Sequence, residues 1–151
     1  MHIALVAVGR LRPYYRDACD DYLRRLGRHA RVAEHEVREA RGATAALQRR
    51  EEGARLRERI PGGARVVVLA IDGTAWSSES FAARVDRWRA DARPVAFVIG
   101  GATGLDDKLT GEAEVRWSLG PLTLPHELAR VLVAEQLYRA FEILGGRPYH
   151  K

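Results

Sequence analysis

Two segments of this chain carry residue types that could hold a small ligand, and each follows a predicted strand. Residues 99–104 read IGGATG, with three glycines directly after an apolar run. Glycine lets a ligand approach the backbone and bond to its amide hydrogens. Residues 118–126 read SLGPLTLPH, which is uncharged before His126 and stiffened by two prolines. Such a segment could accept a flat, neutral ring such as adenine. The structural alternatives are a tight turn at the glycines and a plain connector into the last helix.

The end of the chain offers another set of functional groups. Pro148, Tyr149, His150 and Lys151 bring together an aromatic ring, an imidazole and an ammonium group. These groups suit contact with a nucleic-acid base and a phosphate. The alternative is a terminus without function, because chain ends are often poorly ordered.

Several other chemistries lack their residue patterns. The sequence contains no G-x-G-x-x-G, no G-K-[ST] and no G-x-S-x-G, which argues against a dinucleotide site, a P-loop and a serine hydrolase. The five histidines lack the spacing of metal ligands, so we expect no metal site. The single cysteine, Cys19, excludes an internal disulfide, and we interpret it as a packing residue. Adjacent acids on predicted helices are interpreted as solvated pairs, namely Asp20 with Asp21, Glu51 with Glu52, and Asp106 with Asp107.

The positive charge of the chain is concentrated in its first part. The net charge is +5, and residues 1–60 hold 14 Arg against 9 Asp or Glu. The remaining residues hold 11 basic and 11 acidic side chains and are therefore balanced. Arginine matches phosphate through a planar fork of donors, so the first part of the chain is expected to contact nucleic acid. A GC-rich genome is the alternative explanation for the use of arginine rather than lysine.

The elements that must position these groups alternate along the chain. Apolar runs predict strands at 2–9, 65–71 and 94–99, and an alternation of apolar and polar residues predicts a half-buried strand at 31–37. A further strand is expected at 114–119, and a turn at Asp72 and Gly73. Helical spacing predicts helices at 13–28 and 43–60, a third that begins at Ser77 or Ser78, and two more at 106–112 and 126–144. This alternation predicts a single α/β domain over 1–151, with a mainly parallel sheet and helices on both faces. Ligands of such sheets bind where strands end.

Two further expectations concern the surroundings of this domain. The last helix is apolar over most of its circumference, which predicts either a subunit interface or a central place in the core. The chain has no apolar stretch of about 20 residues and no signal-peptide pattern at its start. We therefore expect a cytoplasmic protein that does not enter a membrane.

Five motifs together resemble a known family. They are VAVGRLR at 6–12, DYLRRLG at 21–27, SSESFA at 77–82, IGGATGL at 99–105 and LTLPHELARVLVAEQLYRAFEILGGRPYHK at 122–151. On these motifs the chain resembles the small SPOUT-class methyltransferases that methylate N3 of a pseudouridine in 23S ribosomal RNA with S-adenosylmethionine. The resemblance covers nearly the whole chain, and the last motif is the most specific.

The resemblance implies a fold, an assembly and a cofactor site. The fold is a SPOUT-type sheet with a C-terminal trefoil knot, and the assembly is a homodimer whose active site lies at the interface. The positions implied to contact S-adenosylmethionine are Leu69, Gly100, Leu119, Gly120, Pro121, Leu122, Thr123 and Leu124. Many members carry an acid directly after the position of Leu69, whereas this chain has Ala70.

Roles in the reaction are expected as follows. His150 and Tyr149 reach in from the partner subunit to assist loss of the N3 proton, and Arg130 holds a phosphate or the ring anion. His126 is a weaker candidate for the same work. The arginines at 10, 12, 24 and 25 are expected to bind the RNA backbone, and the substrate is expected to be an assembled ribosome. The rival class is a dimeric module that docks on ribosomal RNA without chemistry.

Overall fold

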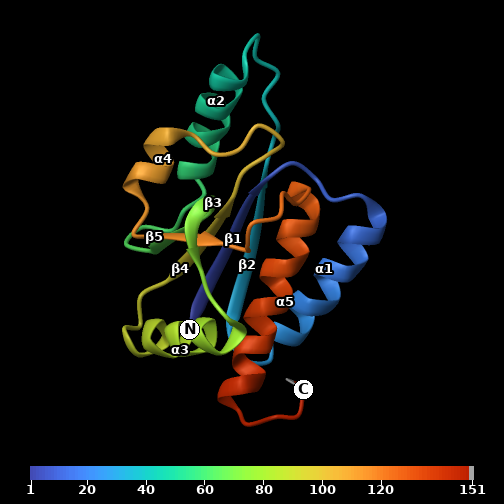
Figure 1. Ribbon diagram of the computed structural model, residues 1–151, viewed down its shortest axis with the longest axis vertical. Coiled ribbons are helices and arrows are strands. Elements are labelled where there is room, and N and C mark those ends of the chain that lie inside the picture. Colours follow the sequence, from blue (N-terminus) through green and yellow to red (C-terminus); the bar gives the residue numbers. More distant parts are fainter. Residues whose placement is uncertain (150–151) are drawn as a thin grey trace.

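The five predicted strands form a parallel sheet. In the computed structural model, which describes residues 1–149, the strands are β1 (His2–Val8), β2 (Arg31–Val37), β3 (Arg65–Ala75), β4 (Val95–Ile99) and β5 (Val115–Ser118). They lie in the order β2-β1-β4-β3-β5, and every neighbouring pair is parallel (Figure 1). The predicted strands are therefore confirmed, and their carboxyl ends point to one edge of the sheet.

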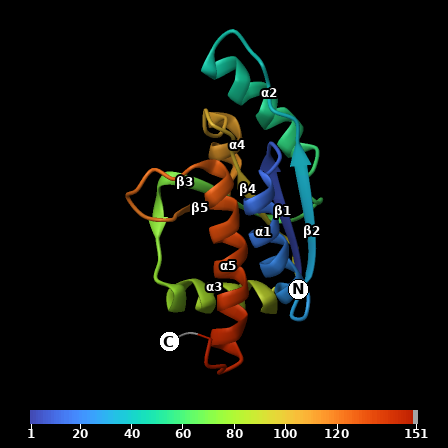
Figure 2. The ribbon, with the colours of Figure 1, turned by 90° about the vertical axis from the view of Figure 1, so that its right-hand side faces the viewer.

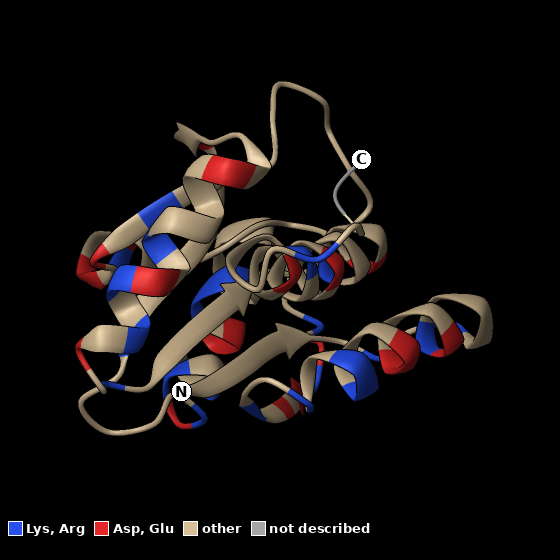
Figure 3. Cartoon of the chain, turned by 90° about the horizontal axis from the view of Figure 1, so that it is seen from below, with Lys and Arg blue, Asp and Glu red and all other residues tan. Residues whose placement is uncertain are grey.

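Five helices cover the two faces of this sheet. They are α1 (Pro13–Leu26), α2 (Ala45–Arg57), α3 (Ser78–Ala90), α4 (Asp107–Glu112) and α5 (His126–Leu144). Odd-numbered residues of β1, such as Leu5, pack in one core with residues of α3 and α5, and even-numbered residues, such as Val6, pack in the other with residues of α2 and α4. In Figure 3 the charged residues lie mainly on the helices, and the strands in the centre are uncharged along most of their length.

Local sequence sets where the helices begin. Pro13 occupies the first turn of α1, where its missing amide hydrogen costs no hydrogen bond. The side chain of Thr44 accepts a hydrogen bond from the Leu47 amide at 3.2 Å and caps α2. Ser77, one of the two predicted candidates, caps α3 by accepting from the Ser80 amide at 3.2 Å.

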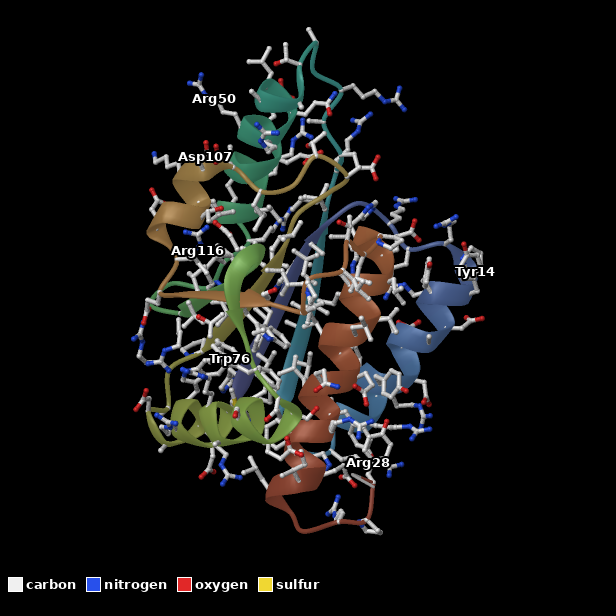
Figure 4. The ribbon with its side chains drawn as sticks, in the orientation of Figure 1. Tyr14, Arg28, Arg50, Trp76, Asp107 and Arg116 are labelled. Atoms are coloured by element: carbon white, nitrogen blue, oxygen red, sulfur yellow. The ribbon has the colours of Figure 1, made fainter. Side chains whose placement is uncertain are left out.

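An aromatic cluster fixes α3 against the β3–β5 half of the sheet. The ring of Phe81 on α3 stacks on Trp117 of β5 with centroids 4.3 Å apart, and Trp76 stacks on Trp117 at 6.0 Å. Trp76 lies between α3 and the sheet in Figure 4. Buried aromatic pairs of this kind contribute energy beyond their apolar area. Because Trp117 directly precedes the 118–124 segment, the cluster holds the start of that segment.

The predicted end of the third strand is wrong. The chain was expected to turn at Asp72 and Gly73, but β3 continues to Ala75. Leu69 and Thr74 both pair with Trp117, so residues 70–73 leave the ladder and return to it. A Cβ on Gly73 would lie 2.6 Å from the carbonyl oxygen of Arg116, which means that only glycine fits this detour. The Asp-Gly pair thus lies within the detour, directly before the chain returns to the ladder at Thr74, and does not end the strand.

Helix α5 occupies a central place in the core of the single protomer. It packs between α1 and α3 on one face of the sheet (Figures 1 and 2). Cys19 of α1 is buried against Val131 and Ala134 of α5, which confirms its packing role, and burial raises the pKa of its thiol to about 12. Within residues 1–149 no helix is long and apolar enough to cross a membrane. The homodimer and the trefoil knot stay predictions.

Candidate active site

Three chain segments meet in one cleft at the carboxyl edge of the sheet. The cleft has a volume of about 340 Å³ and lies beyond the ends of β3, β4 and β5. It is lined by residues 69–71, by residues 99–104, by 118–120 and 122–124, and by His126 and Ala129 at the start of α5. None of these lining residues is an acid, a lysine or an arginine, and His126 is the one titratable side chain among them.

The structure brings together seven of the eight residues that the resemblance assigned to the cofactor. These are Leu69, Gly100, Leu119, Gly120, Leu122, Thr123 and Leu124. The eighth, Pro121, is exposed and is not part of the lining. It lies between two lining residues, so its contribution is to the shape of the segment. Residues in the detour of β3 and in the 101–104 loop complete the wall.

The glycine loop after β4 has a close-packed conformation. Gly104 donates its amide hydrogen to the Gly101 carbonyl at 3.0 Å, which closes the turn. A Cβ on Gly100 would lie 2.8 Å from the carbonyl carbon of Gly104, and Gly104 itself has a φ of +86°. No larger residue fits at position 100 without moving backbone atoms, and position 104 favours glycine because its φ is positive. The loop therefore presents backbone to the cleft at the end of a fully buried strand.

The segment after β5 forms an apolar rim. The Gly120 amide donates to Ser118 Oγ at 3.2 Å, and Gly120 has a φ of +115°. These features turn the chain outward, and Figure 2 shows the segment projecting beside β3. Leu122 is 75% exposed, and Ile71 in the detour of β3 is 72% exposed. Two large apolar side chains thus remain exposed at the mouth of a cleft that is poor in charge.

Arg130 is buried away from solvent, which corrects the expectation that it holds a phosphate directly. Its side chain is 0% exposed. Nη2 donates to the carbonyl oxygens of Val8 and Gly9 at 3.1 and 2.8 Å, and Nη1 donates to Glu36 at 2.7 Å. The guanidinium thereby ties the start of α5 to the ends of β1 and β2. The sequence concealed this because Arg130 and its partners lie far apart along the chain.

A second ion pair ties the first turn of α5 to the segment after β1. Glu127 accepts from the Arg12 backbone amide at 2.8 Å and from Arg12 Nε at 3.1 Å. These bonds lower the pKa of the Glu127 carboxyl from its ordinary value, and the bond to Glu127 raises the pKa of Arg12. His126, the residue that faces the cleft, is thus followed by an anchored turn.

Tyr149 lies far from the cleft of its own chain. Its hydroxyl donates to Glu135 at 3.2 Å, and its ring packs edge-on against Tyr138 with centroids 4.9 Å apart. Glu135 is about 14 Å along α5 from His126, at 1.5 Å rise per residue. Burial first, and then a hydrogen bond with Tyr22, raise the pKa of the Tyr149 hydroxyl, so it stays protonated at neutral pH. His150, the other tail residue with an expected role, lies outside the described residues.

Helix α2 supports the glycine loop from behind, a contribution that sequence patterns missed. Glu52 was interpreted as solvated, yet it is only 5% exposed. Its Oε1 accepts from the Ala40 amide at 3.0 Å, and its Oε2 is buried beside Gly101 without a hydrogen-bond partner among residues 1–149. One turn earlier, Arg49 Nη1 donates to the Thr103 carbonyl at 3.3 Å. The spacing of Arg49 and Glu52 on one helical face was the available signal.

The fold and the cleft define an α/β protein that binds its ligand beyond the carboxyl ends of a parallel sheet. A sequence family described as "Predicted SPOUT methyltransferase" matches residues 1–150. Curated proteins named ribosomal RNA large subunit methyltransferase H, from Stutzerimonas stutzeri and Chromohalobacter salexigens, are each 43% identical to this chain over 155 residues, with 100% of both chains covered. The chain belongs to the SPOUT methyltransferase family.

Solved structures agree with this assignment at the level of the fold. A putative methyltransferase from Legionella pneumophila, solved with bound S-adenosylmethionine, matches with a TM-score of 0.54 and 13% identity over 93% of this chain. A probable methylase family protein from Haemophilus influenzae matches with a TM-score of 0.57 and 14% identity over 95%. The match spans 66% of each of those longer chains. The expected SPOUT-type sheet is therefore confirmed.

Proposed function

We propose that this protein uses S-adenosylmethionine to methylate N3 of a pseudouridine in 23S ribosomal RNA. One observation carries the proposal above all others. The cofactor positions implied by the resemblance converge on one charge-poor cleft, in a chain 43% identical over its full length to ribosomal RNA large subunit methyltransferases H. The choice of pseudouridine as the target nucleotide, and of N3 as the methylated atom, rests on the family resemblance.

The chemistry of the cleft fits the proposed cofactor. Backbone amides and carbonyls at 99–104 and 118–120 can bond to the edge of an adenine ring, and Leu69, Leu119 and Leu124 provide apolar contacts for its faces. The backbone around Gly100 leaves no room for a Cβ, and such a surface is suited to a ligand held close to the backbone. The few charges in the lining suit a donor whose own sulfonium is cationic. When bound, this donor supplies an electrophilic methyl group.

The protein's part in the reaction is placement and proton transfer. Methylation would form an N–C bond at N3 as the methyl–sulfur bond of the donor breaks and leaves a neutral thioether, and the N3 proton is lost. The site therefore has to align N3 and accept that proton. We assign proton acceptance to His150 and hydrogen bonding to the ring to Tyr149, whose raised pKa keeps its hydroxyl a donor. Arg130 acts as a positioning residue, because it holds α5 against β1 and β2. His126 faces the cleft and is the alternative acceptor.

We propose that the protein acts as a homodimer. The position of Tyr149 supports this proposal, because Tyr149 packs on α5 well away from the cleft of its own chain and would contribute instead to the cleft of a second copy. A groove of about 350 Å³ adjoins the cleft and is lined by Trp76, Leu119, Leu132 and Gln136 among others. Together with the exposed side chains of Leu122 and Ile71, this groove offers an apolar surface for the partner.

The same proposal includes the location and form of the substrate. We assign the protein to the cytoplasm, where ribosomal RNA is found, and the assembled ribosome as its substrate. A chain of 151 residues has little surface with which to read an RNA sequence, so recognition of a folded RNA surface is favoured.

The direct test is a methylation assay on purified ribosomal particles with S-adenosylmethionine and mass mapping of the 23S product. The expected result is one added methyl group, on a pseudouridine. Free 23S RNA, large subunits and whole ribosomes are compared in parallel to identify the substrate. Binding to the particles without methyl transfer would favour the rival class, a docking module. Calorimetric titration with S-adenosylmethionine separates the two classes independently.

Composite active sites are tested by mixing two inactive variants. Gly100→Val removes the cofactor cradle, and His150→Ala removes the proposed proton acceptor. If the tail acts on the partner's cleft, a mixed dimer contains one intact site and activity returns. If the tail acts within its own chain, no mixture recovers activity.

A further inference from the structure

A second depression lies at the carboxyl ends of β1 and β2, beside the cleft. It has a volume of about 700 Å³. Its lining consists of Gly9, Arg10, Glu36, Val37, Arg38, Glu39 and Arg41, and we refer to it as the arginine groove. Three arginines, from the connection after β1 and the connection after β2, thus face one hollow, although the sequence separates Arg10 from the other two by a helix and a strand.

The arginines of this groove differ from most others in the first part of the chain. Of the four arginines that were expected to bind the RNA backbone, three are paired with acids: Arg12 with Glu127, and Arg24 and Arg25 with Asp21. Within the described part of the chain, the guanidinium groups of Arg10, Arg38 and Arg41 have no hydrogen-bond or ion-pair partner, and all three residues are exposed. They therefore keep their donors for a ligand.

The acids of the groove reduce this positive charge only in part. Glu36 already bonds to the guanidinium groups of Arg16 and Arg130, so its charge is balanced outside the groove. Glu39 lies over Gly9, where a Cβ would meet its Oε1 at 2.6 Å. Arg50 of α2 points away from the molecule (Figure 4) and does not add to the groove. The excess of cationic donors in the hollow favours an anionic ligand with several charges.

Val8 and Glu52 lie between the groove and the cleft. Strand β1 pairs with β4, with Ala7 opposite Ile99, so the loop after β1 lies beside the glycine loop after β4. A Cβ on Gly101 would lie 3.0 Å from Val8 Cγ1 and 3.2 Å from Glu52 Oε2. The other oxygen of Glu52 holds the Ala40 amide, between Arg38 and Arg41. Neighbouring strands lie about 4.8 Å apart, which places the two hollows about 10 Å apart along the sheet edge.

We propose that the arginine groove binds backbone phosphates of the RNA strand next to the nucleotide being methylated, an inference that rests on the proposed function. Guanidinium forks match phosphate oxygens, and contacts of this type position an RNA without reading its sequence. Because the groove and the cleft are neighbours, an RNA strand held in the groove can present one base to the cleft. Glu52 lies between the groove-lining segment and the glycine loop and contacts both.

The experiment compares two pairs of substitutions of equal charge. Arg38→Gln with Arg41→Gln removes two cations of the groove. Arg59→Gln with Arg87→Gln removes two exposed arginines that precede the amino ends of β3 and β4, at the opposite edge of the sheet. Binding to purified bacterial large ribosomal subunits, both free and within whole ribosomes, is measured by co-sedimentation across a salt series, and the affinity for S-adenosylmethionine is measured by calorimetry. Thermal melting confirms that each variant is folded, and Arg10→Gln is an independent single variant.

The groove pair is expected to weaken subunit binding about tenfold and to lower the slope of log affinity against log salt by about 1 to 2. Arg10→Gln should weaken it less, and the affinity for S-adenosylmethionine should not change. Unchanged subunit binding in the groove pair, or an equal loss in the control pair, would overturn the proposal. Subunit binding is measured separately from methyl transfer. A wild-type protein that binds subunits but methylates nothing would therefore refute the proposed function, whereas the groove proposal would still be decided by the binding of the groove pair.

Discussion

The substitution Gly100→Ala tests the cofactor cleft with a single added methyl group. The new Cβ would lie 2.8 Å from the carbonyl carbon of Gly104, 2.9 Å from its oxygen and 3.0 Å from the amide nitrogen of Leu105. All three atoms belong to the backbone, so no side-chain rotation relieves the contacts. The turn that Gly101 and Gly104 close has to open or move away from its present position.

The size of the effect follows from the cost of such a contact. Inserting a methyl group into closely packed surroundings costs about 1–3 kcal/mol. If that cost falls on the conformation that binds the cofactor, the dissociation constant for S-adenosylmethionine rises about 5- to 140-fold, because 1.4 kcal/mol is a factor of ten. Strand β4 is buried on both sides and ends before the loop, so the fold itself should survive.

Calorimetric titration with S-adenosylmethionine measures this change, and thermal melting monitors the fold. The matched control is Gly111→Ala in α4, where an added Cβ meets nothing within 4 Å. This control should leave cofactor affinity unchanged and stabilise the helix by up to about 1 kcal/mol. A folded Gly100→Ala variant that binds the cofactor with wild-type affinity would refute the assignment of the cleft.

Three further predictions concern buried or anchored groups. Arg130→Met should lower the free energy of unfolding in urea by about 3–5 kcal/mol, because Glu36 and two carbonyls lose their partner; a loss below 1 kcal/mol would contradict the positioning role. Glu127 has a lowered pKa, so its stabilisation is complete above its ordinary value of 4.5 and is lost as pH falls through the folded pKa. Urea unfolding at several pH values should show that loss of unfolding free energy in the wild type and a flatter pH profile in Glu127→Gln. Identical profiles would contradict a stabilising role for the ionised Glu127 carboxylate. The Cys19 thiol, with a pKa of about 12, should resist an aromatic disulfide reagent at pH 8 until denaturant is added, and rapid native reaction would show that it is accessible.

The fold was predictable because its signals are local. Strands β1 and β4 are apolar runs, β2 alternates apolar and polar residues, and α1, α2 and α3 begin at a proline or a capping hydroxyl residue. The sheet rule that ligands bind at strand ends then placed the glycine loop and the 118–124 segment near one another. The detour of β3 was missed, because a return to the same ladder depends on the partner strand and leaves no local pattern.

The charged residues were predictable only where their partners are close in sequence. Asp21 with Arg24 and Arg25 follows the helical spacing of three and four residues. Arg12 pairs with Glu127, which is 115 positions away, and Arg130 with Glu36 across 94 positions. Such pairs form only when the sheet brings loops and helix starts together. The exposed arginines of the groove therefore became distinguishable from the paired ones only in three dimensions.

Because β3 makes this detour, the shape of the cleft mouth can change without disturbing the sheet. Leu69 and Thr74 meet the same tryptophan, so the four residues between them form a pendant loop on an otherwise uninterrupted ladder. Side chains at residues 70–72 can therefore change without altering the pairing on either side, whereas Gly73 has to remain glycine because it lies against the Arg116 carbonyl. The entrance can thus become wider, narrower or more polar while the aromatic layer beneath stays as it is, which makes residues 70–72 the natural place to alter which molecules gain entry.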